Sequence, residues 1–253
     1  MDFNIMTWNT QMFEMGNKLK NDQIDIKPIE FSIYKFAIEK IDEHLKKKNA
    51  IVILEEIPFY CWEDGKEHVL FTMFKAHYKG TKYKLLYNII NKHQIKMTVV
   101  IAEKDIIDKD EKGICSNLFV SFKILNTDLY VLAVHSHNAL ELWNKISTSK
   151  DYSPQIILGD FNVGNYLTND KERNCKMADN RHYYLMLLNG YIDICQGQYT
   201  TKYKSQIDHV LLKNSEAFWE NYNFKSVMIN RNIKISDHYP ITFILTTTSG
   251  AYK

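Results

Sequence analysis

Glycine, proline and cysteine are scarce in this chain of 253 residues, which has 9, 4 and 4 of them. No Gly/Ser-rich or Pro-rich linker, internal repeat or low-complexity block divides the sequence. We therefore expect a single domain over residues 1–253, with 246–253 as a loose tail. Cys61, Cys115, Cys175 and Cys195 form no C-x-x-C motif and have no zinc-finger spacing to histidine. This pattern predicts reduced cysteines rather than a disulfide framework.

Long hydrophobic runs are also missing. The longest uncharged apolar runs, such as residues 51–54 and 131–134, are far shorter than the ~18–20 residues that cross a bilayer. Residues 1–6 lack the basic and apolar regions of a signal peptide. Hydrophobic residues make up 45% of the chain and charged residues 25%, an ordinary globular composition. We expect a folded cytoplasmic protein, monomeric and without a membrane partner.

Charge is nearly balanced, with 32 basic and 30 acidic residues and a net charge of +2. Its distribution is uneven, because residues 75–96 hold six lysines and no acid, whereas residues 103–111 hold five acids and two lysines. Histidines and tyrosines lie among the lysines of residues 75–96. A basic, aromatic stretch can follow a nucleic-acid backbone. The alternative, an ordinary solvated face, is favoured, and both interpretations stay open.

The hydrophobic pattern predicts many strands and a few helices. Helices are expected at residues 28–48, 66–79 and 180–189, where apolar residues recur at helical spacing or a glycine ends the pattern. Strands are expected where β-branched and aromatic residues cluster, at 3–9, 50–57, 83–90, 96–103, 118–125, 129–135, 155–160, 206–212, 224–229 and 241–247. This order predicts an α/β fold of two packed sheets with helices outside.

Polar residues recur at or near the ends of the predicted strands and short apolar segments. They are Asn9, Glu55, Glu56, His135, Asp160, Asn162, Asp208, His209, Asp237 and His238. Strand ends place such side chains at the rim of a sheet, where a rigid scaffold holds them in place. Clustered carboxylates repel one another and need a cation to offset their charge. The pattern therefore indicates one polar site with a bound cation.

The donor types indicate which cation and which chemistry. Carboxylate and amide oxygens without a nearby thiolate favour Mg²⁺ or Mn²⁺ over Zn²⁺. A metal of this kind polarises a phosphate oxygen and promotes formation of an attacking hydroxide. Neighbouring histidines can transfer protons or donate hydrogen bonds to the phosphate. Metal-assisted cleavage of a phosphoester is therefore the predicted reaction.

At these residues the chain resembles the endonuclease/exonuclease/phosphatase superfamily, also called DNase I-like. The matching segments occur in the family's order and are TWNT at 7–10, LEE at 54–56, AVHS at 133–136, LGDFN at 158–162, IDH at 207–209 and SDHYP at 236–240. The most specific of them is SDHYP before a terminal strand. The resemblance covers nearly the whole chain and implies a four-layer α-β-β-α sandwich of two packed mixed β-sheets.

The resemblance also implies roles for the site residues. Glu56, Asn9 and Asp237 match metal ligands, and Asn9, Asn162 and His238 match residues that contact the phosphate. Asp160, with Asn162 beside it, matches the residue that positions or deprotonates the attacking water. Asp208 matches the acid that orients His238, and His135 matches a histidine that protonates the leaving oxygen. The implied function is a divalent-metal-dependent phosphodiesterase, with a nuclease acting on DNA or RNA as the favoured case.

Two departures and two alternatives accompany this interpretation. The family usually has glutamine at the position of Glu55, and strand alternation predicts that Glu55 and Glu56 face opposite ways, so we expect one of them to be structural and Glu56 to be the ligand. His209 stands where the family often has an aromatic residue, and packing is an alternative role for it. His137 either shares the face of His135 or lies in a loop.

Two alternative functions stay open. One is a phosphatase or phosphodiesterase of small molecules or lipid headgroups, sphingomyelinase-like or inositol-phosphatase-like. The other is a catalytically silent binding module.

Overall fold

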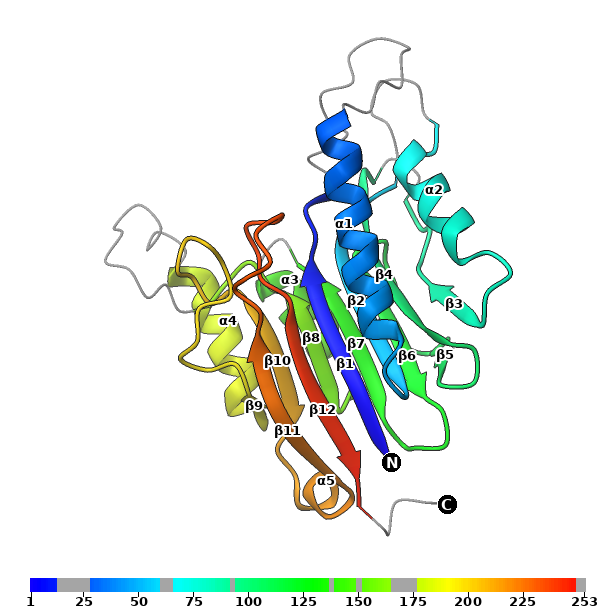
Figure 1. Cartoon of the computed structure of the whole chain (residues 1–253). Helices are drawn as coiled ribbons and strands as arrows, with labels where there is room; N and C mark the ends of the chain where they lie inside the picture. The colour runs from blue at the N-terminus through cyan, green and yellow to red at the C-terminus, as the bar shows by residue number, and fades with distance from the viewer. Residues whose placement is uncertain are drawn as a thin grey trace.

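The structure is a computed structural model, and it describes residues 1–12, 28–59, 66–91, 94–136, 139–148, 152–164 and 177–248. Two six-stranded mixed sheets lie face to face, and helices cover their outer faces (Figure 1). The predicted α/β four-layer sandwich is therefore confirmed. None of the described helices is long and apolar enough to span a membrane.

The first sheet has the strand order β11-β12-β1-β2-β4-β3. Its strands are β1 (Asp2–Asn9), β2 (Ala50–Pro58), β3 (Tyr83–Leu86), β4 (Lys96–Glu103), β11 (Tyr222–Ile229) and β12 (Ile241–Thr247). Only β1 and β2 pair in parallel, and the other neighbours pair antiparallel. Helices α1 (Pro28–Leu45) and α2 (Val69–Tyr78) pack on its outer face.

The second sheet has the strand order β5-β6-β7-β8-β10-β9. Its strands are β5 (Ile107–Lys109), β6 (Phe119–Ile124), β7 (Tyr130–His135), β8 (Ile156–Asp160), β9 (Tyr191–Asp193) and β10 (Asp208–Lys213). Here β7 and β8 are the parallel pair. Helices α3 (Ala139–Thr148) and α4 (Met177–Leu188) cover its outer face, and α5 (Glu216–Asn221) precedes β11.

Alternation along the central strands explains their continuous apolar sequences. In β2, Ile51 and Ile53 join the cluster between the sheets, whereas Val52 and Leu54 pack under α1 and α2. The strands β7 and β8 divide their side chains between the two faces of the second sheet in the same way. A strand buried on both faces needs apolar residues at every position. The apolar runs of the central strands therefore account for their position between a layer of helices and the facing sheet.

Several element predictions need correction. The helix expected at 28–48 ends at Leu45, and the strand expected at 83–90 ends at Leu86. The short strands β5 and β9 and the helices α3 and α5 were not expected. Thr246 and Thr247 belong to β12 rather than to the loose tail, and residues 249–253 lie outside the described part. Cys115 and Cys195 carry free thiols, as expected, whereas Cys61 and Cys175 lie outside the described residues.

Candidate active site

The arrangement of the strands brings the predicted site residues to one end of the sandwich. The parallel strands β1, β2, β7 and β8 all end there, whereas β10 and β12 begin there. A hydrogen bond of 2.9 Å from Asn9 Nδ2 to Asp160 Oδ2 joins the two sheets at this end, and one of 3.3 Å from Trp8 Nε1 to the His238 carbonyl joins β1 to the loop before β12. Residues distant in sequence therefore meet because strands of both directions share this end.

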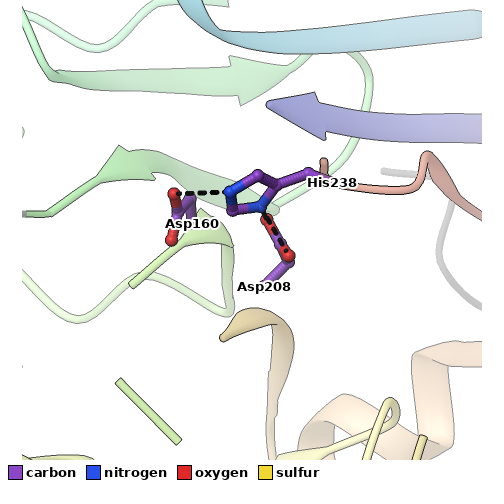
Figure 2. Close-up of side chains that lie close together, drawn as sticks. All are labelled: Asp160, Asp208 and His238. Carbon is purple, nitrogen blue, oxygen red and sulfur yellow. Dashed lines mark hydrogen bonds and ion pairs between the residues drawn. The ribbon is translucent and has the colours of Figure 1, made fainter. Parts of the chain in front are cut away.

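The centre of the site is a buried histidine between carboxylates. His238 Nδ1 lies 2.8 and 2.9 Å from the two carboxylate oxygens of Asp208, and its Nε2 lies 3.8 Å from Asp160 Oδ2 (Figure 2). The same nitrogen lies 3.6 Å from Asp237 Oδ1. Burial opposes the charged imidazole, but Asp208, Asp160 and Asp237 outweigh it and raise the pKa of His238 to about 10. The ring is therefore a cation and a donor at neutral pH.

Asp208 is itself held in place from the opposite side. Its Oδ2 accepts a hydrogen bond of 2.6 Å from the hydroxyl of Thr200, which also accepts one from the backbone N–H of Asp208. These two hydrogen bonds orient the Asp208 carboxylate, which in turn orients the His238 ring. Sequence reasoning missed Thr200, because a threonine eight residues before an aspartate carries no signal of its own.

Asp160 links the two histidines of the site. Its Oδ2 accepts from Asn9 and lies 3.8 Å from His135 Nε2, while its Oδ1 accepts from the backbone N–H of Asn162 at 2.8 Å. Burial, together with the charge of Asp208, raises the pKa of Asp160 above its ordinary value, although His238 and His135 act against this shift. A carboxylate with a raised pKa suits transfer of a proton.

Glu56 approaches the site from the other flank. Its Oε1 lies 3.3 Å from His135 Nε2 and 2.7 Å from the ammonium of Lys96. Burial works against ionisation, but hydrogen bonds and charge from His135 and Lys96 overcome it and lower the pKa of Glu56 to about 2. Sequence reasoning missed Lys96, which it grouped with the basic stretch and not with the site.

The two glutamates do not follow simple strand alternation. The pairing of β2 with β4 is interrupted between Leu54 and Ile57, and Glu56 has a φ of 56°. Glu55 is fully buried, accepts a hydrogen bond of 2.8 Å from the Thr7 hydroxyl, and has an Oε2 atom without a hydrogen-bond partner among the described residues. Burial raises the pKa of Glu55 well above its ordinary value. The surroundings of Glu55 beneath the site therefore favour its protonated form.

The segment after β8 carries Asn162 in a strained turn. Asn162 has a φ of 53° and donates from Nδ2 to the Ser136 carbonyl at 2.9 Å. The Val163 carbonyl lies 2.7 Å from Nε2 of buried His209, whose Nδ1 lies 2.7 Å from Asp193. His209 thus packs, as one interpretation expected, but also forms an ion pair. His137 lies outside the described residues.

All eight predicted site residues are in one connected cluster. They are Asn9, Glu56, His135, Asp160, Asn162, Asp208, Asp237 and His238. Within it, Asp160, Asp208 and His238 each offer a ligand atom, and these atoms lie within 4.8 Å of one another. This buried group could hold a metal ion. It differs from the predicted ligand set of Asn9, Glu56 and Asp237, of which Asp237 has a buried Oδ1 without a hydrogen-bond partner in the described part.

Most lysines of the basic stretch, residues 75–96, form ion pairs. Four of its lysines contact carboxylates at 3.2 Å or less: Lys75 with Glu67, Lys82 with Glu103, Lys84 with Asp108 and Lys96 with Glu56. Lys92 lies outside the described residues. Pairing offsets the positive charge that would attract a polyanion. The structure therefore favours the solvated-face interpretation for Lys75, Lys82 and Lys84, whereas the mostly buried Lys96 belongs to the site.

Comparison with known proteins gives matches in structure only. No protein-family model and no curated protein matches the sequence. Among solved structures, a humanized D. rerio TDP2 has a TM-score of 0.62 and 14% identity, with 97% of this chain and 99% of that chain covered. The endonuclease domain of TRAS1, a telomere-specific non-LTR retrotransposon, has a TM-score of 0.61, 12% identity and 97% and 98% coverage.

A third similar structure is an endonuclease/exonuclease/phosphatase from Bacteroides vulgatus, with a TM-score of 0.59, 16% identity and coverage of 98% of this chain and 100% of that chain. Nearly the full length of each protein is thus superimposed, at identities that show the fold alone. The chain has the fold of the DNase I-like endonuclease/exonuclease/phosphatase structures.

Proposed function

We propose that this chain is a divalent-metal-dependent phosphodiesterase whose substrate is DNA or RNA. The observation that carries the proposal is the buried Asp208–His238–Asp160 line, in which an acid fixes a cationic imidazole next to a second acid. A fixed cationic donor beside a candidate base suits in-line attack of water on a phosphodiester, because the donor stabilises charge on the phosphate and the base accepts the proton of the water. Two of the similar structures are D. rerio TDP2 complexed with a single-strand DNA product and the endonuclease domain of TRAS1.

The residues present fit a divalent metal. We assign it to oxygens of Glu56, Asn9 and Asp237, the ligand set that the resemblance implies. Asp208 is given the role of orienting His238, because its two oxygens face His238 Nδ1 and the Thr200 hydroxyl. Glu56 stays ionised, since its pKa is lowered to about 2, and Asp237 Oδ1 is buried without a hydrogen-bond partner in the described part. Bound Mg²⁺ or Mn²⁺ would supply the charge that polarises a phosphoryl oxygen and acidifies the attacking water.

The protein groups divide the remaining work. His238, oriented by Asp208, donates from Nε2 to a non-bridging phosphate oxygen. Asp160, held by Asn9 and by the Asn162 N–H, aligns the water and accepts its proton. Asn162 contacts the phosphate beside it. His135, close to both Glu56 and Asp160, gives a proton to the departing oxygen.

The proposal is tested on a panel of single- and double-stranded DNA, RNA and a generic small diester, bis(p-nitrophenyl) phosphate, with Mg²⁺, Mn²⁺ or EDTA. Cleavage is expected with either metal and not with EDTA. Asp160→Asn and His238→Gln should each lower the rate by ~10²-fold or more. Asp2→Asn is the matched control, because Asp2 is exposed at the opposite end of the strand that carries Asn9.

Two other outcomes decide against it. The alternative of a small-molecule or lipid-headgroup phosphoesterase predicts hydrolysis of the small diester, inositol phosphates or sphingomyelin while every nucleic acid stays intact. The silent binding module predicts a metal-induced rise in melting temperature without turnover of any phosphoester. Equal rates for Asp160→Asn and Asp2→Asn would contradict the assigned chemistry.

A further inference from the structure

A short basic turn lies directly beside the residues that would contact the phosphate. The N–H of Lys202 donates to the Asp237 carbonyl at 2.7 Å, and the N–H of Tyr239 donates to the Thr200 carbonyl at 2.8 Å. Thr201 and His238 form an isolated β-bridge. The turn before β10 is therefore attached to the loop before β12, at the end of the sheets where β1 also ends (Figure 1).

The backbone of this turn is fixed by buried groups. The Thr201 hydroxyl lies 2.6 Å from the Ser205 hydroxyl and accepts from the Ser205 N–H at 3.2 Å, and both residues are buried. The Lys204 N–H donates to the Thr201 carbonyl at 3.1 Å, and Lys204 has a φ of 58°. Because these hydrogen bonds fix the backbone of the turn, its exposed side chains are attached at fixed positions.

Those outward side chains are two lysines and a tyrosine. Lys202, Tyr203 and Lys204 are all exposed, and Tyr203 keeps 45% of its surface accessible. The ammonium of Lys202 lies 5.0 Å from the centroid of the Tyr203 ring. We call residues 202–204 the basic–aromatic turn.

The surrounding sequence adds positive charge and no acid. No acidic residue lies between Asp193 and Asp208 or between Glu220 and Asp237. In the second of these segments, Arg231 stacks 4.0 Å from the Tyr199 ring centroid and donates to the Tyr199 carbonyl at 3.3 Å. The lysines at 75, 82, 84 and 96 contact carboxylates. Lys202 and Lys204, by contrast, lie next to the site in a segment of sequence without acidic residues.

We propose that the basic–aromatic turn binds single-stranded nucleic acid next to the scissile phosphate. Lys202 and Lys204 contact backbone phosphates, and the ring of Tyr203 stacks on an unpaired base. Grooves that combine lysines with exposed aromatic rings bind single strands without sequence preference, because every base has a stacking face. This inference rests on the proposed phosphodiesterase function and names the form of its substrate.

Binding is measured with the inactive Asp160→Asn chain and a fluorescent single-stranded oligonucleotide, by anisotropy at several salt concentrations. Lys202→Ala with Lys204→Ala should weaken binding and reduce the slope of log K against log salt by ~0.7 for each phosphate that is no longer neutralised. Tyr203→Ala should weaken binding about tenfold, and Tyr203→Trp should retain it. Lys46→Ala with Lys48→Ala is the charge-matched control, because both lysines are exposed at the other end of β1 and β2.

Activity separates a failure of this inference from a failure of the proposed function. In the otherwise wild-type chain, the ratio of kcat/KM for the oligonucleotide to kcat/KM for bis(p-nitrophenyl) phosphate should fall about tenfold in the Tyr203→Ala variant. An unchanged ratio and an unchanged salt slope overturn the role of the turn while the phosphodiesterase stands. Absence of diester cleavage by the wild-type chain overturns both. Tighter binding to duplex than to single strands also contradicts the stacking role.

Discussion

The imidazole of His209 on β10 is paired with Asp193 on β9 at 2.7 Å, and both side chains are buried. Asp193 also accepts hydrogen bonds from Tyr183 and Gln206. Through its other nitrogen His209 contacts the Val163 carbonyl, one residue beyond Asn162. The His209–Asp193 pair, which lies outside the site, therefore supports the segment that carries Asn162.

Replacing only one partner of the His209–Asp193 pair should reduce the free energy of unfolding more than replacing both partners. His209→Phe leaves Asp193 buried without its cationic partner, and we expect a loss of ~3–5 kcal/mol in the free energy of unfolding. Adding Asp193→Asn to His209→Phe should recover part of that loss, because no buried charge then remains. Denaturant unfolding of the two single variants and the double variant measures the coupling. Strictly additive losses would contradict a direct interaction.

Gly164 should tolerate no side chain. A Cβ there would lie 2.1 Å from the Gln206 carbonyl oxygen and 2.7 Å from His209 Nε2, at a φ of +146°. We expect Gly164→Ala to cost at least ~2 kcal/mol and to lower activity further, since it displaces the segment that carries Asn162. Gly197→Ala is the control, because Gly197 has a positive φ but no atom within 4 Å of the added Cβ. Equal melting temperatures for the two variants would show that Gly164 has room.

The protonation of His238 should depend on Asp208. In metal-free protein, an NMR titration of the His238 ring is expected to give a pKa of about 10, and Asp208→Asn should lower it. Because this pKa is raised above the ordinary 6.5, the stabilisation is fully present below pH 6.5 and is lost as the pH rises through about 10. The stability difference between wild type and Asp208→Asn should therefore shrink over that interval. A pKa near 6.5 in the wild-type protein would refute the pairing.

Glu55→Gln should stabilise the protein at neutral pH. Burial raises the pKa of Glu55 well above 4.5, so the wild-type chain keeps in the folded state a proton that the unfolded chain releases. The stability associated with that carboxyl is complete below pH 4.5 and declines as the pH rises. Thermal unfolding from pH 4 to pH 8 should show the advantage of Glu55→Gln growing with pH. An advantage that is constant across this range would contradict a neutral Glu55.

Metal binding should stabilise the folded chain. A ligand at 100 times its dissociation constant adds ~2.7 kcal/mol, so saturating Mn²⁺ should raise the melting temperature above that in EDTA. Glu56→Gln and Asp237→Asn should reduce this rise, whereas Asp2→Asn should retain it. A full rise in both site variants would assign the metal to other residues, such as Asp160, Asp208 and His238.

The central strands and most of the site's composition could be predicted from the sequence because their signals are local. Residues 96–103 form β4 as predicted, since an apolar run between turn residues specifies a strand directly. Asp160 and His238 could be singled out because each stands next to a strand end in a distinctive segment. The helix α3 was missed even though Leu142 packs on the second sheet, because its short apolar stripe lies between polar residues.

The geometry of the site could not be predicted, because it depends on contacts between residues far apart in sequence. Lys96 pairs with Glu56 across 40 residues, and the positive φ of Glu56 arises where β2 and β4 lose register. Strand alternation alone therefore does not describe the backbone that carries the two glutamates. In the same way, the acids that pair with Lys82 and Lys84 lie 21 and 24 residues away.

The position of β1 between β2 and β12 has a consequence during synthesis. The ribosome makes β1 long before its partner β12, and β1 must wait for it, because residues 2–7 pair with residues 241–246. Asn9 and the loop before β12 come together with that pairing, because the Ser236 hydroxyl donates to the Asn9 carbonyl at 2.8 Å. The topology thus makes completion of the candidate site depend on β12, which is synthesised long after β1.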